Sequence, residues 1–369
     1  MSLTGSPSGS LTGSPSGSLS GSPTESPTGS LSGSLSGIAA RRLGPTLPAA
    51  LLLAALLLVT LLLAALLLTA CPRSLPPPGP PHDRAPVPPP RLTVRFFAAG
   101  NADSILLSTS AGHRVLVDAG LAMEGNHLVR RRLLRFFREQ RIKKLDYFVV
   151  THPHPDHFGD PVQLRRRVAF PSIHTNADGA VLLRTLTLRL RLAAGSPVSI
   201  VTLRQGDHLE LGRLQLRVLS PSRAAKPPLQ VSSPGEQNER SLVLMAQYGS
   251  HRFLLAADLG YAGERTLLDT GLPLRADVLK LGHHGQGSTS DAWLRRVRPK
   301  FAVATCGHDA LGSRRELSRA LLTRLNLHKV KLLRTDRHGD VVFETDGRNL
   351  RWETYPSHVF RPRPTIPAR

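Results

Sequence analysis

Residues 152–157 hold four potential metal ligands: His152, His154, Asp156 and His157. The preceding run 145–150 is rich in aromatic and β-branched residues and is expected to form a buried strand, so the ligands follow a strand end. Imidazole nitrogens with one carboxylate suit zinc or a similar first-row ion. Pro153 and Pro155 are expected to stiffen the turn and to keep it from becoming helix. The alternative interpretation is a surface turn that is rich in histidine.

Two later stretches offer further ligands, because each also ends a strand-like run. The apolar run 253–257 leads into Asp258, a carboxylate that could instead be the N-cap of a following helix. The run 276–281 leads into the pair His283 and His284. One of the pair is expected to bind metal, and its neighbour is expected to contact substrate or to orient a ligand. The sequence leaves open which histidine does which, and two structural histidines are the alternative.

The motif at 152–157 and the Gly-His-His-Gly element at 282–285 resemble the metal-binding signatures of metallo-β-lactamase-fold hydrolases. The resemblance runs from about Leu92 to about Tyr355 and narrows to the hydrolase domain of ComEC-type competence proteins. It implies a four-layer αββα sandwich. The alternation of strand-like and helix-like segments by itself indicates only an α/β domain.

The resemblance also implies a centre with two divalent ions. His152 and His154 would hold one ion, and Asp258 would bridge it to the second, although Ala257 stands where relatives usually have glycine. The ligands expected at the second ion are Asp156, His157 and one of His283 and His284. Zn²⁺ is the expected ion and Mn²⁺ the second choice. Such a centre hydrolyses its substrate with metal-bound hydroxide. The predicted catalytic residues are Asp156, His283 and His284.

Other positions match the family more weakly. Asp118 ends a strand and is expected to orient a metal-binding histidine, with a simple turn aspartate as the alternative. Asp103 keeps its place in the opening strand-turn-strand pattern, and Asn238 is expected to approach the site from behind the ligands. Many relatives supply a further histidine near Asn238, and none is evident here. One ion is therefore expected to be held more weakly than the other.

The loop after the histidine pair contains three hydroxyl residues ahead of a helix expected near 291–297: Ser288, Thr289 and Ser290. Hydroxyls and free amides at a helix N-terminus form a ready anion site, so these residues are predicted to bind a substrate phosphate. Capping of the helix by Ser290 alone is the alternative.

The composition points to a polyanionic partner. The 369 residues carry a net charge of +22, and the sequence pI is about 11.4. Such a field favours nucleic acid or anionic lipid headgroups. The alternative is an arginine-rich coding bias without a binding role. The two cysteines, Cys71 and Cys306, suggest no disulfide framework, and no protein partner is identifiable.

The chain divides by composition into five segments, which are 1–37, 38–71, 72–90, 91–356 and 357–369. They are a low-complexity repeat, a leader, a Pro-rich linker, the hydrolase-like domain and a basic tail. In the leader, an arginine pair precedes an apolar run at 47–70, which ends in Leu-Thr-Ala-Cys. This ending resembles a lipobox, so Cys71 is predicted to be lipidated, and an uncleaved transmembrane anchor is the alternative. Both interpretations place the domain in the cell envelope, outside the cytoplasm.

The chemistry and the charge together predict a metal-dependent hydrolase of phosphodiester bonds, with extracytoplasmic nucleic acid, DNA included, as the leading substrate. A hydrolase of a lactam, lactone or thioester is the second hypothesis. A tethered DNA-binding module without catalysis is the third. No Gly-x-Ser-x-Gly elbow occurs in the domain, so a serine nucleophile of that kind is not indicated.

Overall fold

The computed structural model describes residues 54, 56–63, 90–123, 126–127, 132–225, 232–308 and 315–356. The chain divides into two units, Met1–His82 and Asp83–Arg369. In the first unit residues 56–63 are helical. Among the residues that are described, no helix is both long and apolar enough to span a bilayer. The predictions for the low-complexity repeat, for Cys71, for the linker up to residue 89 and for the tail 357–369 lie outside the described residues.

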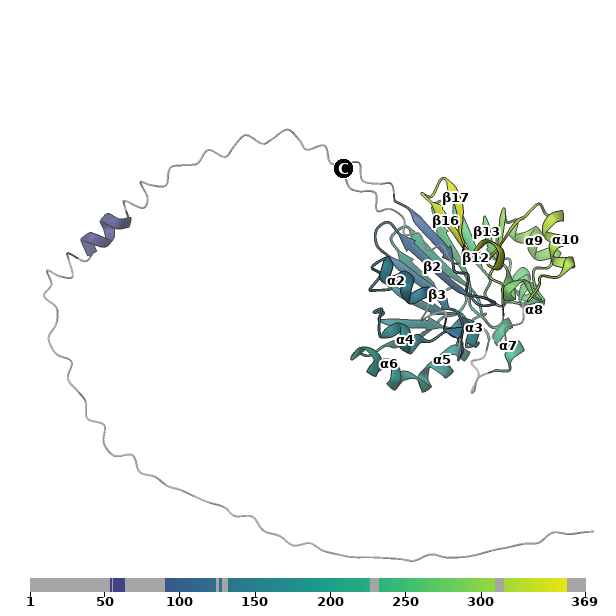
Figure 1. The fold of residues 1–369 in the computed structure, drawn as a ribbon, viewed down its shortest axis with the longest axis horizontal. Helices are drawn as coiled ribbons and strands as arrows, with labels where there is room; N and C mark the ends of the chain where they lie inside the picture. The colour runs from purple at the N-terminus through teal and green to yellow at the C-terminus, as the bar shows by residue number, and fades with distance from the viewer. Residues whose placement is uncertain are drawn as a thin grey trace, which may run out of the picture. The chain divides into compact units, whose positions relative to one another are not determined.

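The second unit is built on two large mixed sheets (Figure 1). The first sheet has eight strands in the order β17, β16, β1, β2, β3, β6, β7, β8. Their bounds are β1 Leu92–Phe96, β2 Ser104–Thr109, β3 Arg114–Ala119, β6 Tyr147–Val150, β7 Ser172–Thr175, β8 Ser199–Thr202, β16 Asp340–Thr345 and β17 Leu350–Tyr355. Strands β3, β6, β7 and β8 run parallel, and the remaining neighbours pair antiparallel.

The second sheet has seven strands in the order β15, β14, β13, β12, β11, β10, β9. Their bounds are β9 His208–Leu211, β10 Leu214–Ser220, β11 Val243–Tyr248, β12 His251–Leu255, β13 Val278–Lys280, β14 Phe301–Ala304 and β15 Lys331–Arg334. Strands β12 to β15 are parallel. A small hairpin pairs β4 (Ala122–Met123) with β5 (Asn126–His127).

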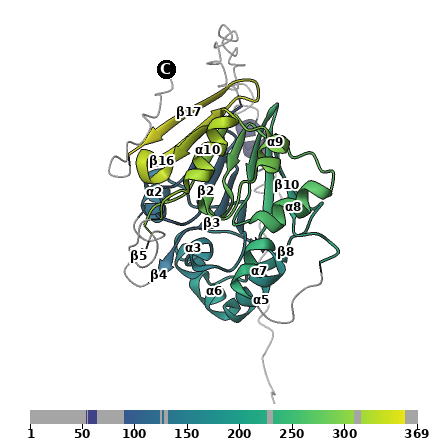
Figure 2. The same cartoon turned by 90° about the vertical axis from the view of Figure 1, so that its right-hand side faces the viewer.

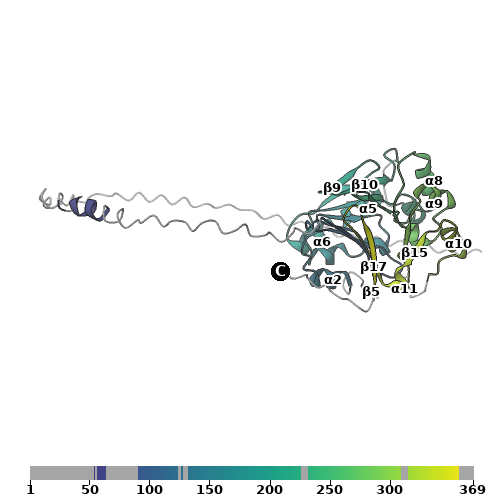
Figure 3. The same cartoon turned by 90° about the horizontal axis from the view of Figure 1, so that it is seen from above.

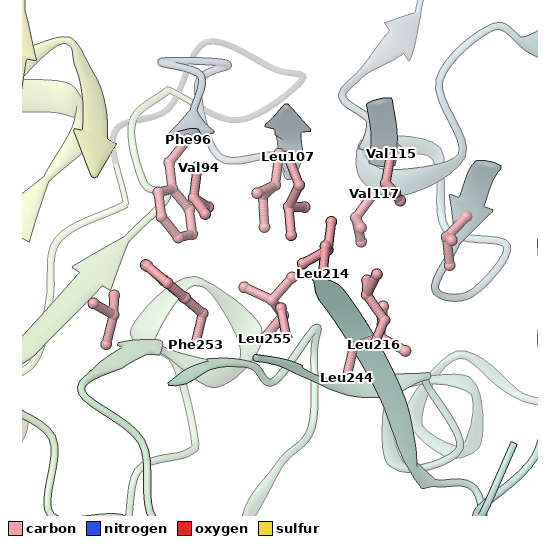
Figure 4. Close-up of a cluster of buried hydrophobic side chains, with 14 of the residues drawn as sticks. Val94, Phe96, Leu107, Val115, Val117, Leu214, Leu216, Leu244, Phe253 and Leu255 are labelled. Atoms are coloured by element: carbon pink, nitrogen blue, oxygen red, sulfur yellow. The ribbon is translucent and has the colours of Figure 1, made fainter. Parts of the chain in front are cut away.

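The two sheets pack face to face through alternating apolar side chains. Phe96 and Leu107 of the first sheet point toward Phe253 and Leu255 of the second, and all four are buried (Figure 4). The alternation arises because successive side chains of a strand point to opposite faces. Truncating one such phenylalanine to alanine costs about 3–5 kcal/mol, so this layer fixes how the strand ends of both sheets meet.

Helices cover the outer face of each sheet (Figures 2 and 3). On the first sheet these are α2 Leu134–Glu139, α3 Pro155–Phe158, α4 Pro161–Arg165, α5 Ala177–Thr185 and α6 Thr187–Ala194. On the second they are α8 Tyr261–Asp269, α9 Asp291–Val297 and α10 Arg319–Leu327. The remaining elements are α7 Pro234–Glu239, the 3₁₀ turn η2 Gly282–Gly285 and α11 Thr335–His338. This order of layers is the predicted αββα sandwich.

Some predicted elements are wrong in extent. The helical spacing of the apolar residues over 126–140 predicts one helix there, but residues 126–127 pair as β5, and the described part of the range contains α2. The spacing over 179–192 predicts one amphipathic helix, and the structure has two, α5 and α6, which meet at Leu186. Pro155 was expected to prevent helix but instead begins α3. The first position of a helix needs no backbone N–H partner, so proline is favourable there.

Candidate metal centre

The predicted ligands converge at the ends of parallel strands from both sheets. Strand β6 leads directly into Thr151 and His152, and the single turn of α3 then presents Asp156 and His157. On the facing sheet β12 leads into Asp258, and its parallel neighbour β13 leads into η2 with the histidine pair. Carboxyl ends of parallel strands lie at one edge of a sheet. Predicted ligands that are about a hundred residues apart in the sequence therefore lie close together.

Three groups of side chains place their ligand atoms within 4.8 Å of one another, and two of these groups share Asp258. The outer set is His152, His154 and Asp258. The inner set is Asp156, His157, Asp258 and His284. Asp258 belongs to both and is almost fully buried. Its Oδ1 lies 3.0 Å from His157 Nε2, while its Oδ2 lies 4.0 Å from His152 Nε2. The two oxygens of one carboxylate thus face different sets.

The structure separates the two adjacent histidines. His284 is fully buried, and its Nε2 lies 3.3 Å from Asp156 Oδ2 and 3.5 Å from Asp258 Oδ1. The side chain of His283 is 42% exposed, and its Nε2 lies 3.8 Å from Asp258 Oδ2. His284 therefore stands in the inner set, and His283 stands at the opening of the outer set.

An unusual backbone produces this separation. Both histidines are left-handed, with φ of 45° at His283 and 54° at His284. Such a conformation costs a non-glycine residue roughly 1–2 kcal/mol. The chain can reverse here because Gly285 (φ 90°) follows. A Cβ at Gly282 would lie 2.3 Å from the Leu259 carbonyl oxygen, so only glycine fits there.

A layer of buried partners fixes the ligand imidazoles. Asp118 Oδ2 accepts a hydrogen bond from His157 Nδ1 at 2.8 Å, and Asp118 Oδ1 accepts from the Thr151 amide at 2.7 Å. His284 Nδ1 donates to the Thr305 carbonyl at 3.0 Å, since that oxygen can only accept. With Nδ1 engaged in both rings, each Nε2 is left to face the inner set. Asp118 therefore lies where an orienting carboxylate was expected.

Asp103 occupies a second supporting position. It is buried, accepts a hydrogen bond from the Thr305 hydroxyl and forms an ion pair with Lys280. Its carboxylate also lies 3.6 Å from His157 Nδ1 and 3.5 Å from His284 Nδ1. Asp103 thus lies behind the inner set and not among its ligand atoms.

The electrostatics of the site separate the histidines into two kinds. Burial lowers the pKa of His284, but the carboxylates of Asp258 and Asp103 outweigh it and raise the pKa to about 9. The same opposition raises the pKa of His157 well above its ordinary value. The pKa of His152 is lowered instead, because burial and the neighbouring His157 hold it well below the ordinary value. Burial disfavours the charged form of Asp258, yet His157 and His284 keep its pKa far below the usual range.

The predicted phosphate loop is engaged elsewhere. The carboxylate of Glu264 accepts hydrogen bonds from the amides of Thr289 and Ser290, so the two amides that were expected to be free are occupied. The hydroxyl of Ser288 donates to the Gly282 carbonyl at 2.6 Å. The hydroxyl of Ser290 caps α9 by accepting from the Trp293 amide. The structure therefore favours the capping alternative and gives this loop the task of holding η2 in place.

Asn238 is not brought to the ligands by any contact among the described residues. It lies in α7, where its carbonyl accepts from the amide and hydroxyl of Ser241. Its side-chain Oδ1 is buried without a hydrogen-bond partner. The expectation that Asn238 supports the site thus stays a prediction.

The donor set fits divalent ions. The buried side-chain atoms that lack hydrogen-bond partners include five that face this centre: Nε2 of His152, His154, His157 and His284, and Oδ1 of Asp258. Unpaired buried polar atoms cost about 1–3 kcal/mol each. Imidazole nitrogens with carboxylate oxygens are ligands that Zn²⁺ and Mn²⁺ accept.

Sequence reasoning missed two residues that shape this centre. Lys280 is a fully buried cation at the end of β13, and a lysine within an otherwise apolar strand is a signal that could have found it. Glu264 holds the loop after the histidine pair, but nothing in its local sequence on α8 indicates that partner.

The chain belongs to the metallo-beta-lactamase superfamily. The sequence model of that superfamily matches residues 98–308, which is more than half of the chain. The predicted resemblance and fold class are thereby confirmed. Membership makes the chain a metal-dependent hydrolase by class and implies divalent metal ions.

Two curated relatives are competence proteins. ComE operon protein 3 of Bacillus subtilis (strain 168) is 28% identical over 285 residues, which cover 72% of this chain and 34% of the relative. Competence protein ComA of Neisseria gonorrhoeae is 36% identical over 110 residues, which cover 29% of this chain and 16% of the relative. The chain thus matches about a third or less of the length of either relative.

Solved structures of this fold are similar at low identity. The metallo-beta-lactamase fold protein YhfI from Bacillus subtilis has a TM-score of 0.47 and 13% identity, over 69% of this chain and 100% of that one. A diphosphatase from the PhnP family has a TM-score of 0.40 and 16% identity, over 69% of this chain and 98% of that one.

Proposed function

We propose that the domain hydrolyses phosphodiester bonds of nucleic acid outside the cytoplasm, at a centre of two divalent ions. The observation that supports it most directly is the convergence of four buried imidazole nitrogens without hydrogen-bond partners around one carboxylate, that of Asp258. Its two oxygens face two separate ligand sets, so one bridging residue would serve both ions. Zn²⁺ is the first choice and Mn²⁺ the second, because imidazole is the commonest donor in the two sets.

The residues of the chain have distinct tasks in this reaction. When bound, the ions would lower the pKa of water and stabilise the negative charge that develops on oxygen. Asp118 and Thr305 hold the rings of His157 and His284 in the tautomer that leaves Nε2 toward the ions. Burial outweighs the attraction of Asp258 and lowers the pKa of His283. His283 thus meets the substrate as a neutral imidazole that can donate one hydrogen bond to a phosphate oxygen.

A basic groove supports a polyanionic substrate. One depression of about 760 Å³ begins at Pro153 and Pro155, which flank ligand His154, and extends to Arg166 and Arg189. A second, of about 610 Å³, continues past Arg166. The basic side chains that line the two depressions and are exposed are Lys143, Lys144, Arg166, Arg167 and Arg189.

The charge of this groove is nearly uncompensated. Among the described residues none of these five cations forms an ion pair with a carboxylate. Asp160 is the one acidic residue in the lining of the two depressions, and its side chain caps α4. Cations in such a row neutralise successive phosphates of a strand and release their counterions. A nucleic-acid strand bound along α4 and α6 would therefore extend to the ligand motif at 152–157.

The proposal is tested by metal analysis together with degradation of single-stranded DNA, double-stranded DNA and bis(p-nitrophenyl) phosphate. His154→Ala and Asp258→Ala each remove ligand atoms and are expected to lower turnover of all three by at least about a hundredfold. His208→Ala, a change of an exposed histidine on β9, is the matched control and should keep wild-type turnover. DNA binding without turnover at any metal supplied would leave only the binding-module hypothesis. Turnover of an ester or lactam but of no phosphodiester would favour the second hypothesis.

We also propose that the domain is tethered to the cell envelope, through a lipidated Cys71 or through the apolar run 47–70. The leader pattern and the similarity to two competence proteins support this placement. Lipidation predicts that the mature protein begins at Cys71 and carries a lipid there, which mass spectrometry detects. An apolar anchor predicts that the run 47–70 stays on the protein and that Cys71 carries no lipid.

A further inference from the structure

Lys280 lies in the wall behind the inner set. It ends β13, its side chain has no exposed surface, and its Nζ donates to the Ala257 carbonyl at 2.7 Å. The same Nζ forms an ion pair with Asp103 and lies 3.7 Å from Asp258 Oδ1. A buried lysine is strongly destabilising unless it is paired. Its charge is therefore held in place by two carboxylates and one carbonyl.

The buried carboxylates near Lys280 are more numerous than its single positive charge. Four aspartates gather here: Asp103, Asp118, Asp156 and Asp258. Asp103, Asp118 and His157 form a third group of possible metal ligands, which we call the rear group. Within the rear group, His157 Nδ1 already donates a hydrogen bond to Asp118, and the Lys280 ammonium forms an ion pair with Asp103. Lysine thus occupies the place that a cation in the rear group would take.

The position of this ammonium also bears on the inner set. It lies against Asp258 Oδ1, which is the oxygen that faces His157 and His284. An ion in the inner set would share that oxygen with Lys280, and two like charges on one oxygen in a buried site repel strongly. No ion pair or hydrogen bond among the described residues joins Lys280 to the outer set through Asp258 Oδ2.

We propose that Lys280 is a built-in cation that sets the metal content of the centre. It fills the rear group, and it lowers the affinity of the inner set for its ion below what the four donors of that set would give. The inference rests on the metal centre proposed above. Lys280 contributes no ligand atom to the centre, so its task there is electrostatic.

The test is a titration of metal-free full-length protein with Mn²⁺ and Zn²⁺ by calorimetry, with bound metal counted by elemental analysis. Lys280→Met keeps the length of the side chain and removes the charge, and Lys280→Arg keeps the charge. Lys280→Met is expected to tighten the inner set by roughly tenfold or more, because an opposing charge is lost. Lys280→Arg is expected to stay within about threefold of wild type. The same comparison in a His154→Ala background weakens the outer set and reads the inner set alone.

A second variant keeps the inference testable if Lys280→Met fails to fold without metal. Lys280→Met with Asp103→Asn removes both partners of the ion pair, so it leaves the net charge unchanged and should bind metal close to wild type. Unchanged or weaker binding by Lys280→Met, while wild type binds two ions, would overturn the role of Lys280 and leave the proposed function intact. If wild type binds ions but hydrolyses nothing, the proposed function fails and the titrations still decide on Lys280. If wild type binds no ion, both fail.

Discussion

Metal binding to the inner set should release protons and tighten steeply with pH. In the metal-free protein the pKa of His284 is raised to about 9, because the carboxylates of Asp258 and Asp103 outweigh the effect of burial. A metal ion must displace the proton from Nε2 of that ring before it binds. For a group with a pKa of about 9, the fraction without a proton rises roughly 80-fold between pH 6.5 and 8.5, and the apparent affinity rises with it.

His157 steepens the dependence further, since its pKa is also raised well above its ordinary value. Calorimetric titrations at pH 6.5, 7.5 and 8.5, each in two buffers with different ionisation enthalpies, give the affinity and the number of protons released. We expect one to two protons per inner ion at pH 7.5. The stability of the metal-free protein depends on pH in the opposite direction to its metal affinity. The stabilisation from His284 is complete below pH of about 6.5 and is lost as the pH rises through about 9, so thermal stability should fall over that range. A change in affinity below about threefold between pH 6.5 and 8.5 would refute this reasoning.

Three further outcomes follow from particular residues. Asp118→Asn keeps the shape of the side chain but loses its charge beside His157, so metal affinity should fall by about 10–100-fold while the circular dichroism spectrum is unchanged. Ala257 is left-handed (φ 46°), so Ala257→Gly should relieve strain and raise the free energy of unfolding by about 0.5–1 kcal/mol in denaturant titrations; a decrease in stability would contradict the strain. Arg166→Gln with Arg167→Gln should lower the slope of log affinity for DNA against log salt by about one for each phosphate that the variant no longer neutralises, with turnover of bis(p-nitrophenyl) phosphate kept; an unchanged slope would remove the groove from the proposal.

The ligand motif could be predicted from the sequence because its chemistry is local. A strand that ends in closely spaced His and Asp residues leaves those side chains together wherever the strand lies in the sheet. Asp258 and the pair His283 and His284 were also predictable as strand-end residues, and the two-sheet core brings Asp258 against His157 and His284. These assignments needed residue type and strand position only.

The choice between His283 and His284 could not be made from the sequence. Both residues adopt left-handed φ values, and this backbone turns one ring into the inner set and the other toward solvent. The prediction that the loop at 288–290 has free amides was wrong for a related reason. Its amides were expected to be free, but their acceptor is Glu264, which lies on a helix some 25 residues earlier. Spacing along the chain predicts neighbours within an element and not the acceptor that a distant element brings.

Two left-handed residues of the centre, Ala257 and His283, are joined by a backbone hydrogen bond, which helps the chain to tolerate them. The carbonyl of Ala257 accepts from the His283 amide at 3.0 Å and from Lys280 Nζ at 2.7 Å. Ala257, the left-handed residue before Asp258, is thereby linked both to the histidine pair and to the buried cation. Since a hydrogen bond from a charged group contributes about 1.5–3 kcal/mol, the one from Lys280 can offset the strain at Ala257 before any ion is bound. The geometry of the centre is therefore held by the chain itself, and divalent ions would enter a site whose Asp258 carboxylate and facing imidazoles are already in place.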